Sequence, residues 1–292
     1  MDFRGVLSIR PEYVGSPAGR AANLIYRAPP FFSPSLGLQC VQPVNPFIQQ
    51  VNAVQVLYED NHLIIVNKEP GEIVQGDKTG DRPLSETVKQ YIKEKYAKPG
   101  QVFLGVVHRL DRPVSGVVVF ARTSKALARL NAMFQQGKVR KCYHAVACGR
   151  PAEPHRTLVH WLTRNERQNK AYAHDRQVAG SKQAVLDYTL LASSERYHLL
   201  EVNLHTGRHH QIRCQLAAIG CVIKGDLKYG ARRSNPDGSI SLHARHIEFE
   251  HPVSHQLISV DAPYPEGVWK VFGEALPGAE SPEAQGEVSG CR

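Results

Sequence analysis

The sequence predicts an α+β fold built on a mixed, largely antiparallel β-sheet with flanking helices and loops. Two observations predict it. Apolar runs of strand length recur from residue 54 to residue 272, and only a few amphipathic helical segments lie between them. Many strands with interspersed helices and short connections are typical of this fold class. The chain has 292 residues, of which 42% are hydrophobic, so the material for a large core is present.

The first elements are expected to be a hairpin and a helix. Strands are predicted over Val54–Tyr58 and His62–Asn67, joined by a turn at 59–61. The next periodic segment has the spacing of a helix, and Pro83 suits its first turn. Its buried face would hold Leu84, Val88, Tyr91 and Ile92.

A second strand pair and helix follow. The apolar runs Phe103–Val107 and Gly116–Ala121 have strand length. Ser124 is a good N-cap for the next helix, and Gly137 is a good stop. A third helix is expected to begin near Thr206, which can cap it, and to end at Gly220. The remaining strands are predicted at Cys142–Cys148, Val185–Leu191, Tyr197–Leu204, His246–Phe249 and Leu257–Val260.

The two ends of the chain differ from this pattern. Residues 1–50 hold seven of the 19 prolines and no lysine. We interpret residues 1–53 as an extended or disordered arm, with an arginine-rich transit peptide as the alternative. Residues 273–292, rich in Gly, Pro, Ser and Glu, are predicted to be a flexible tail. The catalytic domain would therefore span residues 54–272.

Composition limits the function classes. The formal charge of +9 favours a polyanionic partner, although a protein can also be basic without one. No apolar run approaches the roughly 18 residues that span a bilayer, so a soluble protein without membrane contact is expected. The six cysteines form no close pair with zinc-ligand spacing, and the first 20 residues lack an apolar leader. These features predict reduced structural thiols, no metal site and a cytoplasmic location.

One polar cluster lies between two apolar strands. It runs from His108 to Pro113 and includes Arg109 and Asp111. A loop between core strands that carries such residues suits a functional site. The alternative is a surface turn held by an Asp–Arg ion pair.

A second polar cluster runs from Thr206 to Arg213. At helical spacing, Arg213 lies beside the apolar stripe that includes Ile212. A guanidinium turned toward the core needs a carboxylate partner, and Asp111 is a candidate. The alternative is that Arg213 extends to the surface. Tyr143, on a predicted strand, could stack on a base or simply fill core.

These clusters, in this order, resemble the RluA-type family of RNA pseudouridine synthases over roughly residues 54–272. Each motif alone is weak, but the ordered set is specific. Departures are modest: Val114 stands where the family usually has Thr, and Cys214 where Val is common. The matching residues are Val66-Asn67-Lys68, His108-Arg109-Leu110-Asp111 with Ser115-Gly116, Lys141 with Tyr143 and Ala145, Thr206-Gly207-Arg208, His210-Gln211-Ile212-Arg213, Gly225-Asp226 with Tyr229-Gly230, Leu242-His243-Ala244 and His251-Pro252.

The resemblance implies a pseudouridine synthase catalytic domain that isomerises uridines in rRNA or tRNA without a cofactor. Asp111 would be the catalytic carboxylate, and Arg109 would displace the target base from its stack. Tyr143 would pack against the flipped uracil, and Arg213 would pair with Asp111. Structured RNA would be the partner, and the protein would act as a monomer without an obligatory protein partner.

Two other functions fit parts of the pattern. A catalytically idle RNA-binding protein would not need Asp111, Tyr143 and Arg213 together. A glycosidase or nucleosidase usually needs a second carboxylate, and none accompanies Asp111 in its motif.

Overall fold

A computed structural model describes residues 50–51 and 54–276, and we refer to it as the structure. The predicted arm at 1–53 lies outside the described residues except for Gln50–Val51, which form β1. The predicted tail lies outside them beyond residue 276. No helix among the described residues is long and apolar enough to cross a membrane.

One 12-stranded sheet runs through the molecule in the order β1-β2-β3-β5-β11-β6-β10-β9-β7-β8, with β12 paired to β11 and β4 paired to β5. Among the described strands, β5 and β11 form the parallel pair, and the other pairs are antiparallel. The predicted mixed, largely antiparallel α+β fold is therefore confirmed.

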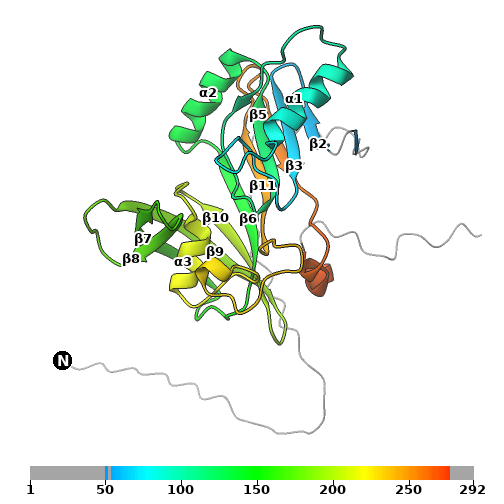
Figure 1. The fold of residues 1–292 in the computed structure, drawn as a ribbon. Coiled ribbons are helices and arrows are strands. Elements are labelled where there is room, and N and C mark those ends of the chain that lie inside the picture. The colour runs from blue at the N-terminus through cyan, green and yellow to red at the C-terminus, as the bar shows by residue number, and fades with distance from the viewer. Residues whose placement is uncertain (1–49, 52–53, 277–292) are drawn as a thin grey trace, which may run out of the picture.

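The sheet has two ends with different helices (Figure 1). One end carries α1 and α2 beside β2, β3 and β5, and the other carries α3 beside β7 to β9, while β6 and β11 run between them. At the first end the elements are β2 Val54–Glu59, β3 Leu63–Lys68, α1 Leu84–Lys95, β4 Gly105–Val106, β5 Ser115–Ala121 and α2 Ser124–Gln135. The others are β6 Arg140–Ala147, β7 His155–Asn165, β8 Lys170–His174, β9 Lys182–Ser193, β10 His198–Leu204, α3 Gln211–Ala218, η1 Leu227–Tyr229, β11 Leu242–Glu250, β12 Leu257–Asp261 and η2 Val268–Ala275.

The two faces of the sheet bury different side chains because strand residues alternate between them. On one face, Ile64 and Val66 of β3 pack in the same cluster as residues of α1 and α3. On the other face, Leu63 and Ile65 pack with residues of α2, β11 and β12. Tyr143 belongs to the first face, which we call the front face. Its neighbours Cys142 and His144 therefore point to the back face.

Several predicted boundaries were wrong. The third helix begins at Gln211 rather than near Thr206, because His210 takes the left-handed conformation at the N-cap, with φ of 51°. The N-cap of α2 is Thr123, whose hydroxyl accepts a hydrogen bond from the backbone N–H of Ala126, rather than Ser124. The strand predicted at Phe103–Val107 is only the two-residue β4. The sequence interpretation missed β7 and β8, which form the edge of the sheet.

Candidate active site

The Asp111 loop connects β4 to β5 and is fixed at its far end by close backbone packing. Val114 donates its backbone N–H to the carbonyl of Asp111 at 3.0 Å, which closes a turn. Gly116 has φ of +115°, and a Cβ there would lie 2.3 Å from the carbonyl oxygen of Ala244 on β11. Only glycine fits this approach, so the loop enters β5 at a defined position.

Lys68 also fixes the Asp111 loop, through hydrogen bonds to its backbone. Its side chain is fully buried at the end of β3, and its ammonium donates to the carbonyls of Glu69, Arg112 and Val114 at 2.8, 3.1 and 2.6 Å. Burial lowers its pKa to about 8. The carbonyls of Arg112 and Val114 lie just after Asp111, so Lys68 orients the backbone that carries this carboxylate. Sequence reasoning noted Lys68 in a motif but gave it no role.

Arg213 projects from α3 into the interior and contacts two carboxylates. It is 5% exposed. Its Nη1 donates to Oδ2 of Asp111 at 2.9 Å, while its Nε and Nη2 donate to the two oxygens of Asp226 at 2.7 and 2.8 Å. The predicted contact with Asp111 is present, but the two-pronged partner is Asp226, which is 1% exposed. Sequence reasoning did not assign that role to Asp226.

His210 also approaches Asp111, with its Nε2 3.4 Å from Oδ2 of that carboxylate. The hydroxyl of Tyr229 accepts the backbone N–H of Ala171 at 2.8 Å and lies 3.0 Å from Nδ1 of His210. A hydroxyl that donates to Nδ1 leaves the ring proton on Nε2, the nitrogen that faces Asp111. Burial, with the Arg213 charge beside it, lowers the pKa of His210 to about 2, so the ring is neutral.

The other predicted site residues lie around this centre. Tyr143 of β6 is buried on the front face with Leu110, and its hydroxyl has no hydrogen bond among the described residues. Burial foremost, and then the nearby Asp111 charge, raises the pKa of Tyr143. Arg109 is exposed and has neither an ion pair nor a hydrogen bond within the described part of the chain.

His108 has a structural role. Its Nε2 accepts the backbone N–H of Val119 at 3.0 Å, and its ring stacks on Phe134 with centroids 5.0 Å apart. Burial lowers its pKa to about 4, so the ring is neutral at physiological pH.

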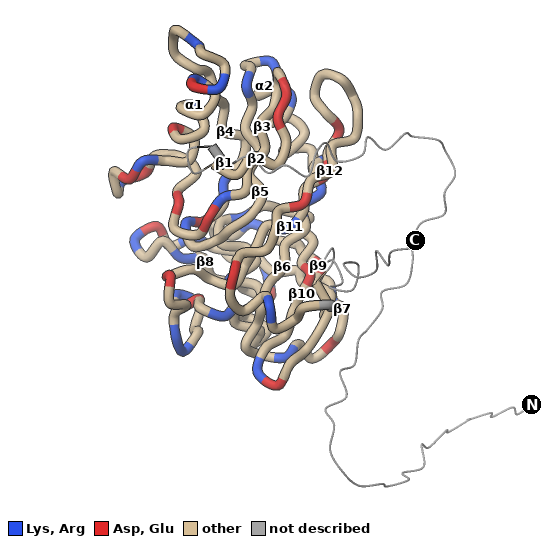
Figure 2. Tube along the Cα trace, turned by 90° about the vertical axis from the view of Figure 1, so that its right-hand side faces the viewer, with Lys and Arg blue, Asp and Glu red and all other residues tan. Residues whose placement is uncertain are grey.

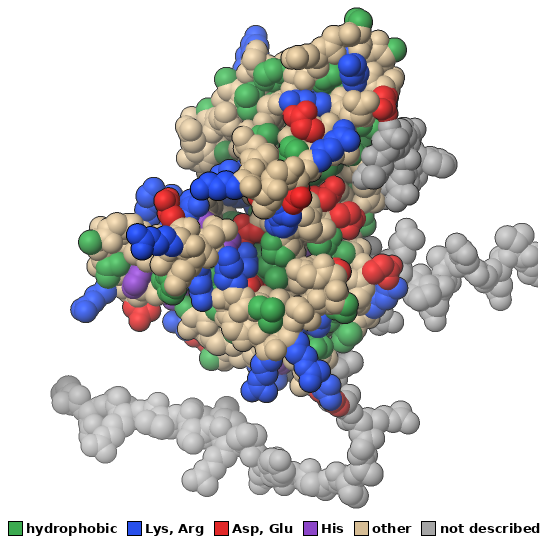
Figure 3. Space-filling model, viewed as in Figure 1, with side chains coloured by type: hydrophobic (Ala, Val, Ile, Leu, Met, Phe, Trp, Pro, Cys, Tyr) green, Lys and Arg blue, Asp and Glu red, His purple; other side chains and the backbone are tan. Residues whose placement is uncertain are grey.

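Basic side chains surround the site. Arg164 and Lys228 lie close enough to His210 to lower its pKa, and the Lys141 charge acts on His108 in the same direction. Figure 3 shows a hollow between the end that carries α2 and the end that carries β7 and β8. Lysine and arginine side chains stand on its two sides, and acidic and histidine side chains lie between them. An anionic chain would be attracted to this rim.

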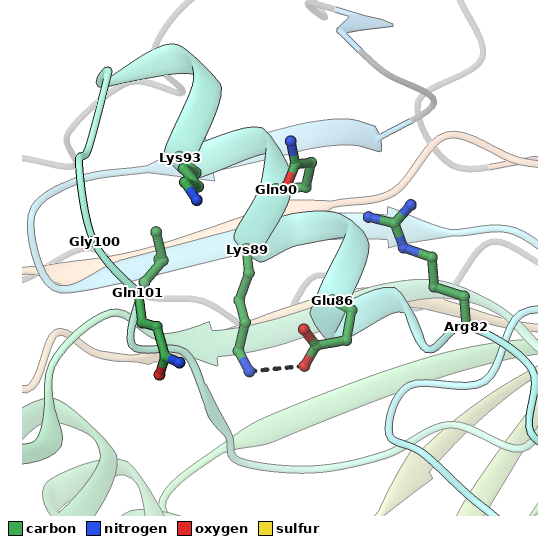
Figure 4. Close-up of a pocket in the computed structure, with 8 residues that line it drawn as sticks. Arg82, Glu86, Lys89, Gln90, Lys93, Gly100 and Gln101 are labelled. Carbon is green, nitrogen blue, oxygen red and sulfur yellow. Dashed lines mark hydrogen bonds and ion pairs between the residues drawn. The ribbon is translucent and has the colours of Figure 1, made fainter.

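A second basic region lies along α1. Figure 2 shows lysine and arginine positions around α1 as well as on the loops beside β8. A hollow of about 540 Å³ there is lined by Arg82, Lys89 and Lys93 among others (Figure 4). Lys89 is paired with Glu86 at 2.7 Å. This hollow includes none of the residues around Asp111, so it offers charge for binding rather than a reacting group.

The arrangement around Asp111 suits nucleophilic or proton-transfer chemistry. The carboxylate keeps 30% of its side-chain surface exposed, while its partners Arg213 and His210 are buried. Oδ2 of Asp111 accepts the hydrogen bond from Arg213, and Oδ1 accepts none from the described residues, so Oδ1 is available to a substrate. A fixed donor of this kind holds a carboxylate in one orientation.

Comparison with known proteins identifies the family. Residues 62–218 match the family model described as RNA pseudouridylate synthase. An uncharacterized RNA pseudouridine synthase of Bacillus subtilis, YhcT, is 32% identical over 75% of this chain and 71% of its own length. Ribosomal large subunit pseudouridine synthase D of Zymomonas mobilis is 30% identical over 75% of this chain and 72% of its own. tRNA pseudouridine synthase C of Pectobacterium carotovorum is 30% identical over 82% and 69%, respectively.

A solved structure agrees on the fold. Human RNA pseudouridylate synthase domain containing 4 covers 72% of this chain and 88% of its own, with a TM-score of 0.60 and 21% identity. The match to the family model covers both the Asp111 loop and α3. This chain therefore belongs to the RNA pseudouridine synthase family and is an isomerase of that type.

Proposed function

We propose that this protein converts uridines of rRNA or tRNA to pseudouridine, with Asp111 as the catalytic carboxylate. Relatives at about 30% identity are named for activity on ribosomal or transfer RNA. The observation that carries the assignment of Asp111 is its geometry. Its carboxylate is partly exposed, accepts a hydrogen bond from Arg213, lies 3.4 Å from neutral His210, and lies near Tyr143 on the front face.

The reaction exchanges one bond for another within the same nucleotide. The bond from ribose C1′ to uracil N1 breaks, the base turns, and C1′ bonds to C5. C5 then loses its proton and N1 gains one, so the reaction is redox-neutral and releases no fragment. Asp111 acts as nucleophile, or stabilises the intermediate, in the first step. Because burial raises the pKa of Tyr143, its phenol is a poor proton acceptor, and Asp111 is the better candidate for removing the C5 proton.

The target base must leave its stack before it reaches Asp111. Extruding a base costs a few kcal/mol, least where it is unpaired. Arg109 is exposed two residues before Asp111 and is not held by another described side chain. It is therefore available to occupy the gap that the base leaves, while the basic rim binds phosphates.

Product analysis tests this function. RNA transcripts of rRNA and tRNA would be incubated with the protein, digested to nucleosides and separated. The proposal predicts pseudouridine at a few positions with no free uracil. Free uracil would indicate a nucleosidase, and unchanged uridine in every transcript, with binding retained, would indicate an idle RNA-binding protein.

The Arg109 role has a separate test with matched substrates. Two RNAs would present the same target uridine, once in a helix and once in a loop. We expect Arg109→Ala to reduce turnover more on the helical RNA, since the loop needs no displacement. Arg196→Ala is the control, because Arg196 is also exposed but lies at the β9–β10 turn, at the far end of β10 from Thr206. Equal losses on both RNAs would contradict the base-displacing role.

A further inference from the structure

The back face of the sheet carries a polar cluster that the isomerase chemistry does not use. Cys142 and His144 of β6 point there, away from Tyr143. Glu201 of β10 lies directly opposite His144 in the strand register. The three residues line a hollow of about 280 Å³ together with Asn203 and His246. A thiol, an imidazole and a carboxylate thus converge at one polar opening on this face.

The ligand atoms are spaced for a metal ion. The Cys142 sulfur, a ring nitrogen of His144 and a Glu201 oxygen all lie within 4.8 Å of one another. The Nε2 of His144 is 3.8 Å from Oε2 of Glu201. Tetrahedral zinc, with bonds of about 2.0–2.3 Å, places its ligand atoms about 3.3–3.8 Å apart. The widest separation in the cluster therefore needs to contract by about 1.0–1.5 Å.

A hydrogen bond with Tyr264 already orients the ring of His144. The Nδ1 of His144 lies 2.8 Å from the hydroxyl of Tyr264, and a proton on Nδ1 would leave Nε2 free for a metal. Metal-binding histidines commonly donate their other ring N–H in this way. His144 is 1% exposed, so its ring has little freedom to turn.

Two arginines line the same hollow, and both have carboxylates near them. Arg140 lies 3.9 Å from Glu248, and Arg245 lies 4.0 Å from Asp261. Arg245 also donates to the carbonyl of Ala262. With these charges offset, a Cys142 thiolate and the Glu201 carboxylate would supply two negative charges to a divalent cation.

We propose that Cys142, His144 and Glu201 bind a zinc ion, with water from the hollow as fourth ligand. Binding displaces the thiol proton of Cys142 to solvent and forms the metal–sulfur bond, with no change of oxidation state. The ion links β6 to β10 directly behind Tyr143. The ion takes no part in the reaction at Asp111, so the isomerase should remain active when a chelator removes the metal. This proposal does not depend on the proposed reaction.

Cobalt(II) titration tests the site in the full-length reduced protein. A thiolate ligand gives cobalt an intense near-ultraviolet charge-transfer band. We expect this band to saturate at one equivalent and to disappear when zinc is added. Cys142→Ser should abolish it, while Cys148→Ser should keep it, since Cys148 is an exposed cysteine just beyond the same strand. No band in the wild type, or an unchanged band in Cys142→Ser, would overturn the proposal.

A second variant, Glu201→Gln, tests the site in case Cys142→Ser does not fold. Glu201 keeps 32% of its side chain exposed, so Glu201→Gln should fold normally. We expect its cobalt affinity to fall at least tenfold while pseudouridine formation stays at the wild-type rate. Unchanged cobalt affinity in Glu201→Gln would remove Glu201 from the site and would overturn the three-ligand proposal.

Discussion

Replacing Arg213 with alanine should destabilise the fold more than any change at Asp111. Arg213→Ala leaves the carboxylate of Asp226 buried, at 1% exposure, without its two-pronged partner. Breaking a buried ion pair from one side costs about 3–5 kcal/mol. Asp111 keeps 30% of its side chain exposed, so Asp111→Asn should cost only about 1 kcal/mol.

Urea denaturation followed by circular dichroism measures both free energies of unfolding. A double variant separates charge burial from lost packing. If the cost of Arg213→Ala comes from the stranded Asp226 charge, Arg213→Met combined with Asp226→Leu should recover most of the lost stability, because an apolar pair can replace a buried ion pair. A loss below about 1 kcal/mol in Arg213→Ala, or a double variant no more stable than Arg213→Ala, would refute the reasoning.

Three further predictions concern residues around Asp111. Lys68 has a pKa lowered to about 8, so the folded protein releases this proton before the unfolded chain does, which adds about 2–3 kcal/mol of stability between pH 8 and pH 10. Buried thiols with raised pKa values, such as Cys214, act in the opposite direction in both proteins, so the free energy of unfolding of the wild type should change between these pH values more favourably than that of Lys68→Met by this amount. An equal pH dependence in the two proteins would contradict the role of Lys68. Gly116→Ala should lower the free energy of unfolding by at least about 3 kcal/mol, because its Cβ would clash with the backbone of Ala244. Gly137→Ala, which has open space around its Cβ, should lower it by about 1 kcal/mol. Equal losses in thermal or urea unfolding would contradict the packing argument. Tyr143→Phe should lower turnover by less than about 100-fold in a single-turnover assay, and a larger loss would make the phenol the catalytic base.

The parts of the fold predicted from sequence are those with strong periodicity. β2, β3 and β5 were expected to within one residue at each end, and the four residues expected on the buried face of α1 are all buried, because apolar side chains repeat at the spacing of each element. Pro83, expected in the first turn of α1, is its N-cap. The hairpin of β7 and β8 was missed because it forms the sheet edge and much of β7 is exposed. The start of α3 was misplaced because a histidine, His210, adopts the left-handed backbone there.

The sequence identified the main residues of the site, but it identified only some of the contacts between them. Asp111 stood out in a polar loop between two apolar strands, and Arg213 stood out beside an apolar helical stripe; the structure joins them across 102 positions of sequence. The additional partner Asp226 could not be chosen from sequence, because one guanidinium has five donors and sequence does not show which carboxylates they reach. The cluster of Cys142 with Glu201 was missed for a similar reason, since strand pairing brings these residues together.

The most direct test of the account is the Asp111→Asn variant on RNA labelled with tritium at C5 of uridine. Pseudouridine formation replaces the C5–H bond, so each turnover releases tritium to water. We predict that Asp111→Asn binds the RNA with nearly wild-type affinity at each salt concentration, because phosphate contacts supply most of the binding. Tritium release should fall to background, since an amide neither attacks nor accepts the proton. Release at a near wild-type rate by the folded variant would show that Asp111 is not the catalytic carboxylate.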